Sequence, residues 1–251
     1  MKRKLVINFA ISLGLFLIIG CSTTQNDQAS NSVLTDRGSF QYYESRDDLT
    51  KDVGQIIDNY IDQVSRIGWQ PHYQLSIEIK NTPALIKLSP DGRKVVIPFW
   101  NEFDHEQKKT FMNWTGNEEA GMVLFHALFN WFFIPHEITH FLQNAGFGDA
   151  SKRYEKEAMA NDFAVAFWMT QKHGPERLVQ LESMLKPVIK RLPNPTPIGE
   201  EVSHYFNTHY QELGSDPDKY GYYQFYLVLN AIQRRASLDF EEMLRSSLPD
   251  K

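Results

Sequence analysis

The feature that most constrains this chain is the run from residue 120 to residue 134, in which only His126 and Asn130 are polar. A helix that is apolar on every side lies either at the centre of a domain or in a membrane. The run is shorter than the about 20 residues that a membrane span needs, and it leads directly into a charged motif. We therefore expect a buried central helix, in which His126 and Asn130 are hydrogen-bonded core groups rather than ligands.

The motif that follows is His136-Glu137-Ile138-Thr139-His140. Helical residues four apart lie on the same face, so His136 and His140 can present two imidazole nitrogens to one metal ion. Glu137 lies about 100° round the helix, where it can reach a water molecule at that metal. Two histidine ligands, a carboxylate base and an open metal position are the parts with which zinc hydrolyses a peptide bond. Pro135 is expected to kink the helix or to begin a new one.

The start of the chain is typical of an exported protein. Met1-Lys2-Arg3-Lys4 is basic and residues 5–20 are apolar apart from Asn8 and Ser12, which predicts a secretory signal peptide over residues 1–20. An uncleaved N-terminal anchor is the alternative. Cys21 directly follows Leu-x-x-Gly, an arrangement that resembles the bacterial lipobox. The resemblance implies a membrane anchor through lipid on Cys21 and a location in the bacterial cell envelope, facing outside the cytoplasm.

The remaining composition predicts one domain on a flexible tether. Residues 21–38 are polar, as in a tether, which leaves residues 39–251 for a folded domain. Cys21 is the only cysteine, so the domain contains no internal disulfide. A net charge of −5 and an isoelectric point near 5.9 show no basic patch, so nucleic acid is not an expected partner.

The residues before the motif predict one helix and a small sheet. Residues 47–67 carry apolar side chains at helical spacing, and residues 74–79, 84–88 and 94–99 form short β-type runs. Ser89-Pro90-Asp91-Gly92 predicts a hairpin between the last two runs. We consider the strand from Arg93 to Trp100 either as one that pairs with an extended substrate or as an ordinary strand. Thr115 and Glu118 have capping-box spacing, which predicts a helix from about 118 to 133.

The C-terminal half is expected to be helical. Ala, Met and Glu favour a helix over residues 154–168, which Gly174-Pro175 should end. Four further helices are expected over residues 176–192, 200–213, 222–235 and 240–247. The predicted fold class is α+β: a small N-terminal sheet packed on the two metal helices, a helical C-terminal lobe, and a cleft between them.

A catalytic zinc keeps three protein ligands, so one more is needed beside the two histidines. The sequence Glu157-Ala158-Met159-Ala160-Asn161-Asp162-Phe163-Ala164, on a helix after the His-Glu-x-x-His helix, resembles that of the gluzincins, the thermolysin-like metallopeptidases. The resemblance implies that Glu157 is the third ligand and that Asn161 hydrogen-bonds a ligand histidine. Asn stands here where Asp is common in that family. Glu155 and Asp162 remain alternative ligands.

The same resemblance implies a zincin-like fold and zinc-dependent hydrolysis of a peptide or protein substrate, with Glu137 as the base. It also implies a His or Tyr from the C-terminal lobe that stabilises the oxyanion. His204, His209, Tyr220, Tyr222 and Tyr223 are the candidates for that role, and the sequence does not distinguish among them. Two other classes remain open: a catalytically degenerate zinc-binding or protein-binding envelope lipoprotein, and an envelope partner protein whose motif is accidental.

Overall fold

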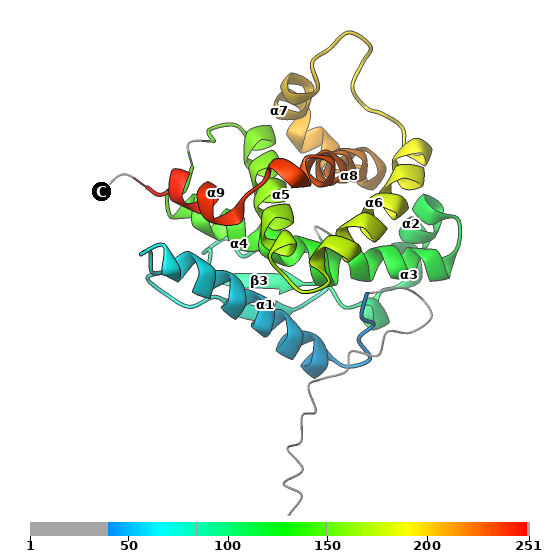
Figure 1. Ribbon diagram of the computed structural model, residues 1–251. Coiled ribbons are helices and arrows are strands. Elements are labelled where there is room, and N and C mark those ends of the chain that lie inside the picture. The colour runs from blue at the N-terminus through cyan, green and yellow to red at the C-terminus, as the bar shows by residue number, and fades with distance from the viewer. Residues whose placement is uncertain (1–39, 84, 149, 250–251) are drawn as a thin grey trace, which may run out of the picture. The chain divides into compact units, whose positions relative to one another are not determined.

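The computed structural model describes residues 40–83, 85–148 and 150–249 (Figure 1). The predicted signal peptide (1–20), Cys21 and the tether (21–38) lie outside these residues. Within them, no helix is both long and apolar enough to cross a membrane. The elements that lead up to the motif are α1 (Arg46–Arg66), β1 (Ser76–Ile79), β2 (Lys87–Leu88), β3 (Lys94–Ile97), a 3₁₀ turn η1 (Trp100–Glu102), α2 (His105–Thr115), α3 (Glu118–Ala127) and the π-helical segment η2 (Leu128–Phe132).

The motif lies on α4 (Phe133–Asn144), and the rest of the described chain is helical. The elements after it are α5 (Arg153–Met169), α6 (Gly174–Arg191), α7 (Val202–Leu213), α8 (Pro217–Gln233), a 3₁₀ turn η3 (Arg235–Ser237) and α9 (Phe240–Ser246). The described fold is therefore mostly helical with one small sheet, in agreement with the predicted α+β class.

Helix α1 is amphipathic, as its spacing predicts. Its buried face carries Leu49, Val53, Ile57, Tyr60 and Val64, and Ser45 caps its N-terminus by accepting from the backbone of Asp48. The hydroxyl oxygens of Tyr60 and Thr139 lie 3.0 Å apart. Because Thr139 donates its own proton to the carbonyl of Pro135, Tyr60 is the donor in this pair. This buried contact fixes α1 against the motif helix.

The sheet has three strands in the order β1-β3-β2, with β1 parallel and β2 antiparallel to β3. The predicted hairpin is confirmed: Gly92 N–H donates to the carbonyl of Ser89 across the turn, at 2.8 Å. The interpretation of residues 93–100 as a substrate-pairing strand is wrong, because β3 is the central strand and both its edges are paired. The edge strand beside the motif is β2, which packs against α4 and whose outer edge is free, since it pairs with no other strand among the described residues.

The predicted buried helix is present, but it is not uniform. It comprises α3, the π-helical segment η2 and the start of α4. A proline inside a helix removes one hydrogen bond and crowds the carbonyl four residues before it, here that of Trp131. The wider π turn, which ends at Phe132, includes Trp131 and so accommodates this disruption. The N-cap of α3 is Asn117, whose side chain accepts from Ala120 N–H, and not Thr115, which ends α2.

His126 and Asn130 are core groups with partners, as predicted. His126 Nδ1 lies 2.8 Å from Asn130 Oδ1, and the amide of Asn130 donates to the carbonyl of Pro98 at 3.1 Å. Both residues are buried. The pair therefore connects the central helix to the end of β3, and neither side chain belongs to a metal site.

One helix end differs from its prediction, and one helix was not predicted. Helix α5 ends at Met169, and Gly174 and Pro175 do not end it but begin α6. Proline is well suited to a first helical turn, where its missing N–H needs no partner. Helix α2 was not predicted, although Asp104 and Gln107 form a capping box at its start. That Asp-x-x-Gln spacing is the pattern from which the helix is predictable.

The packing places α4 between the sheet and the later helices (Figure 1). The sheet and α1 lie on one side of α4, whereas α5 packs on the other and α8 packs against α5. The sheet thus contacts the motif helix mainly, rather than both metal helices as expected. One apolar core extends from Phe40 to Leu244 and includes residues of α6, α8 and α9, whereas Phe206 and Leu213 of α7 form a smaller cluster with Tyr223 of α8.

Acid should weaken the fold through His126. Burial lowers its pKa from 6.5 to about 4, opposed by the hydrogen bond to Asn130. Because the folded pKa lies below the unfolded one, this stabilisation is complete above about pH 6.5 and is lost as the pH falls through about 4. Over this pH range the free energy of unfolding therefore falls by about 3 kcal/mol.

The measurement is the free energy of unfolding against pH for the wild type and His126→Gln, in which an amide replaces the titrating ring. The wild type should lose about 3 kcal/mol more than the variant between pH 7 and pH 4. Parallel pH profiles for the two proteins would contradict this role of His126.

Candidate metal centre

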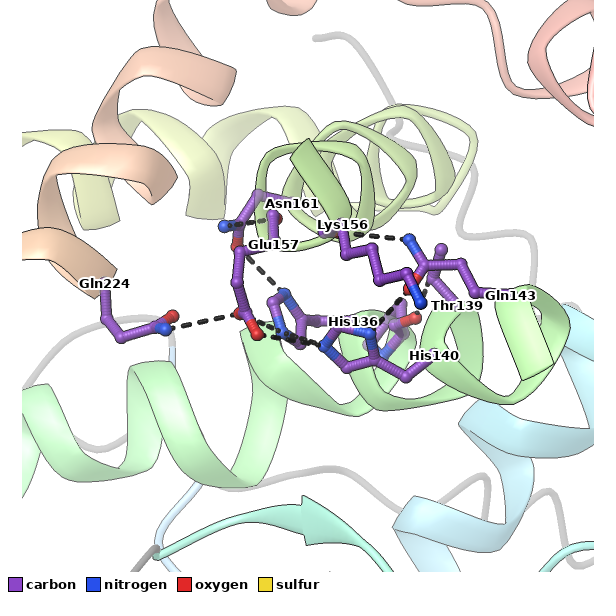
Figure 2. Close-up of polar contacts among 9 residues, drawn as sticks. His136, Thr139, His140, Gln143, Lys156, Glu157, Asn161 and Gln224 are labelled. Atoms are coloured by element: carbon purple, nitrogen blue, oxygen red, sulfur yellow. Dashed lines mark hydrogen bonds and ion pairs between the residues drawn. The ribbon is translucent and has the colours of Figure 1, made fainter. Parts of the chain in front are cut away.

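Three side chains from two helices converge at the centre of the fold (Figure 2). His136 and His140 come from α4, and Glu157 comes from α5. The two Nε2 atoms lie 3.0 Å apart. Glu157 places one carboxylate oxygen 3.4 Å from His136 Nε2 and the other 3.7 Å from His140 Nε2. In the part of the chain that the structure describes, this is the only such group of three or more potential ligands.

The ring of His136 is oriented by Asn161, one turn beyond Glu157 on α5. The amide nitrogen of Asn161 donates to the backbone carbonyl of Glu157 at 2.9 Å, which leaves its oxygen to face His136 Nδ1 at 3.0 Å. Nδ1 therefore carries the proton and Nε2 directs its lone pair into the cluster. This is the contact that the resemblance implies for Asn161.

The ring of His140 is held in the same way by Gln143, which the sequence analysis did not identify. Gln143 Nε2 donates to the carbonyl of Lys156 at 3.0 Å, and its Oε1 lies 2.8 Å from His140 Nδ1. Both imidazoles thus donate from Nδ1 to a side-chain amide that is itself bonded to the α5 backbone (Figure 2). The glutamine three residues after a ligand histidine is the sequence pattern that predicts this contact.

Glu157 and the two histidines shift the pKa values of one another. Burial alone would lower the pKa of His140, but the charge and hydrogen bond of Glu157 raise it to about 9. Burial alone would raise the pKa of Glu157, but His140 and His136 hold it well below its ordinary value. Two imidazole nitrogens that both direct lone pairs at each other repel, so the site favours a cation between them, either a proton or a metal ion.

The distances suit a small metal ion. Metal–nitrogen and metal–oxygen bonds of about 2.0–2.2 Å at tetrahedral angles place neighbouring ligand atoms about 3.3 Å apart. The three separations of 3.0, 3.4 and 3.7 Å are close to this value. His136, His140 and Glu157 can therefore hold one ion. Three protein ligands leave a tetrahedral ion one open position.

The two alternative ligands do not reach the cluster. Asp162 forms an ion pair with Arg234 at 2.7 Å. Glu155 has one buried carboxylate oxygen without a hydrogen-bond partner among the described residues, and it does not belong to the cluster. Of the three acidic residues considered on α5, only Glu157 approaches the histidines. Gln224 of α8 donates to Glu157 Oε2 at 3.2 Å, a contact that the sequence analysis missed.

Glu137 lies beside the three ligands and is itself buried. Burial raises the pKa of its carboxyl group, opposed by the charges of His140 and His136. The backbone N–H of Leu88 in β2 also faces this carboxyl group and lowers its pKa in part. Glu137 is thus held between the histidines and the free edge of the sheet.

A cavity of about 860 Å³ opens onto the cluster. The segment from Leu85 to Pro90, which contains β2, lines it together with residues of α5, α7 and α8. His136, Glu137, His140 and Glu157 all line it. Large aromatic side chains supply much of the remaining surface: Trp114, Phe129, Phe133, Tyr210, Tyr220 and Phe225.

Among the five candidates for oxyanion stabilisation, only Tyr220 lines this cavity. Its hydroxyl is within hydrogen-bonding reach of Tyr210 and Gln224, and burial together with the charge of Glu157 raises its pKa well above the ordinary value. The other four point elsewhere. Tyr223 bonds to Thr196, Tyr222 stacks on Tyr226, His209 stacks on Tyr205, and His204 is exposed.

The arrangement combines three side chains that can hold a metal ion, a buried carboxylate and a phenol around one cavity. Such a set can bind an ion, offer it an open position, and exchange a proton with a bound molecule. No protein-family model, curated protein or solved structure matches this chain.

Removing either amide should weaken metal binding. Asn161→Ala and Gln143→Ala each free one ligand ring, and the loss of such outer contacts costs about 10–100-fold in metal affinity. The affinity is measured by competition with a fluorescent chelator. Gln211→Ala, at an exposed position of α7, is the control and should bind as the wild type does. Unchanged affinity in both amide variants would contradict this role.

Proposed function

We propose that the chain is a zinc-dependent peptidase of gluzincin type, with a zincin-like fold, anchored to the bacterial cell envelope by lipid on Cys21. One observation carries the proposal: His136, His140 and Glu157 converge beside the buried Glu137 at a cavity bordered by a free strand edge. The cell-envelope part rests on the sequence of residues 1–21.

Zinc is the ion that the donor set favours. Two neutral imidazoles and one carboxylate, with one position left open, are the ligands of many catalytic zinc sites. A bound zinc ion would supply Lewis acidity, which polarises a carbonyl group and makes water a stronger acid. His136, His140 and Glu157 would hold the ion, and Asn161 and Gln143 would keep both rings oriented.

Glu137 is proposed as the general base. It would take a proton from the attacking water molecule and deliver it to the nitrogen of the leaving amine as the peptide bond breaks. Burial raises its pKa, which strengthens it as a base in that step. Its position beside the ligands, without being one of them, suits proton transfer.

The free edge of β2 is proposed as the docking site for the substrate backbone. An extended peptide can add to an exposed strand edge through backbone hydrogen bonds. Lys87 and Leu88 line the cavity directly beside Glu137. A peptide paired there would pass its carbonyl groups over the cluster, while the aromatic walls accept its apolar side chains.

Tyr220 is proposed to stabilise the oxyanion that forms during peptide hydrolysis. Its hydroxyl lies in the cavity near Gln224, which in turn holds Glu157. The raised pKa keeps the phenol protonated, so it can donate a hydrogen bond to developing negative charge.

Substitutions of Glu137 and of Glu157 should have different effects on the protein. Glu137→Gln keeps the size of the side chain but removes the proton acceptor, so we expect bound zinc, an intact fold, and turnover lower by roughly 10²–10⁴. Glu157→Ala removes a ligand oxygen, so zinc occupancy and thermal stability should both fall.

Both variants are tested by metal analysis, thermal unfolding and digestion of a peptide library, with and without a chelator. A fully active Glu137→Gln protein would rule out the mechanism. Tight zinc in Glu157→Ala would rule out the ligand assignment. A wild type that holds zinc but cleaves nothing would favour a catalytically degenerate zinc-binding lipoprotein.

Tyr220→Phe should lower kcat by roughly 10²-fold or more with little change in KM, because the lost hydroxyl acts mainly on the transition state. Tyr226→Phe, on the same helix but outside the cavity lining, is the matched control. Steady-state kinetics on one cleaved peptide compare the two. A Tyr220→Phe variant with wild-type kcat would show that another group stabilises the oxyanion.

Cys21→Ser should abolish lipidation and leave an unprocessed precursor, because serine has no thiol to accept the lipid. Labelling with a radioactive fatty acid and membrane fractionation in a bacterial host measure this. A processed, labelled Cys21→Ser protein in the membrane fraction would contradict the lipid anchor.

A further inference from the structure

The cavity carries a charge pattern that the proposed peptidase chemistry does not use. Outside the histidines, three cations in its lining, Lys87, Arg153 and Lys156, outnumber the two carboxylates, Glu137 and Glu157. The chain as a whole is acidic, with a net charge of −5. A cavity of opposite sign to the rest of the protein attracts an anionic ligand.

None of these three cations is neutralised by an ion pair within the part of the chain that the structure describes. Their charges are therefore available to a ligand. The guanidinium of Arg153 lies over the ring of Tyr210, 4.1 Å from its centre, which restrains the long side chain at the cavity wall. Lys156 directly precedes Glu157 in the sequence, and both residues line the cavity.

The backbone of α5 adds to the positive electrostatic potential of the cavity. Arg153 and Lys156 lie in its first turn, where the helix dipole and unpaired N–H groups favour negative charge. The N-cap residue Lys152 contributes no capping oxygen, although Asn207 accepts from the N–H of Tyr154. The side chains of Arg153 and Lys156 and the positive end of α5 thus lie together in the cavity lining.

Other residues of the lining are aromatic. Phe129 and Phe133 precede the ligands on the same helical path, and Trp114 and Phe225 pack together beside them at 5.2 Å between ring centres. Gln143 and Asn144 follow the ligands on α4 and also line the cavity. Along the helical path, His136 and His140 therefore lie between Phe129 and Phe133 on one side and Gln143, which contacts the backbone of Lys156, on the other.

From this arrangement, we infer that the substrate is a peptide with a carboxylate close to the bond that is cut, bound by Arg153 and Lys156. Arg153 precedes Glu157 by one helical turn, a rise of about 6 Å. That rise corresponds to about two residues of extended peptide. The carboxylate is therefore expected within about two residues of the scissile bond, on one side of it. This inference rests on the proposed function.

Two sources supply this carboxylate: an Asp or Glu side chain, or the free C-terminus of a short peptide. Matched peptides separate them. One series moves a Glu, or a Gln as its neutral counterpart, through the positions on either side of the cleaved bond. A second series ends in a free carboxylate or in an amide at those positions.

Binding is measured by calorimetry with the zinc-loaded, full-length Glu137→Gln protein in detergent, and cleavage with the wild type. The carboxylate peptide of one series should bind about five- to tenfold more tightly than its neutral counterpart, and kcat/KM should follow. Added salt should reduce the difference, since these cations are partly open to solvent. Arg153→Gln and Lys156→Gln should each reduce the difference in affinity between the carboxylate peptide and its neutral counterpart. Lys190→Gln, an exposed cation of α6 outside the lining, should leave it unchanged.

The outcomes separate this inference from the proposed function. Cleavage with equal preference for charged and neutral peptides would overturn the inference and leave the peptidase standing. A preference that persists in both Arg153→Gln and Lys156→Gln would also overturn it. Carboxylate-selective binding without cleavage would support a carboxylate-binding site at Arg153 and Lys156, but it would contradict the peptidase and with it the assignment of a substrate that is cut nearby. Neither binding nor cleavage in either series would overturn both.

Discussion

The candidate site depends on how α5 is fixed against α4. Two side-chain amides bridge these helices: Asn161 connects the Glu157 carbonyl to His136, and Gln143 connects the Lys156 carbonyl to His140. Each bridge uses a backbone carbonyl of α5 as its fixed point. The position of the carboxylate and the orientation of both rings are therefore set together, so a small shift of α5 would disturb all three ligands at once.

The surrounding core explains why these helices can hold a buried charged cluster. The helical path before the motif is apolar and packed on all sides, and the π-helical turn at Leu128–Phe132 accommodates Pro135. Tyr60 fixes the other face of α4 through Thr139. Buried charges are costly unless they are paired, and here His140 and Glu157 compensate each other. A bound cation would complete that compensation.

Much of this was predictable from local sequence. Helical spacing gave α1 and the C-terminal helices, and the four-residue spacing of the motif placed His136 and His140 together. Glu157 followed only from a family resemblance, because its approach to the histidines is set by how α5 packs on α4. Gln224 and Tyr220 come from a helix distant in sequence, and strand order placed β2 rather than β3 at the edge. Such long-range packing has no local pattern from which to predict it.

The central claim is that His136, His140 and Glu157 bind one zinc ion. X-ray absorption at the zinc edge, combined with metal analysis of the purified full-length protein, tests it most directly. The account predicts one zinc ion per chain, with two nitrogen ligands at about 2.0 Å and the remaining ligands oxygen at about 2.0–2.2 Å. A protein that binds no stoichiometric zinc, or a zinc ion surrounded by oxygen atoms alone, would contradict it.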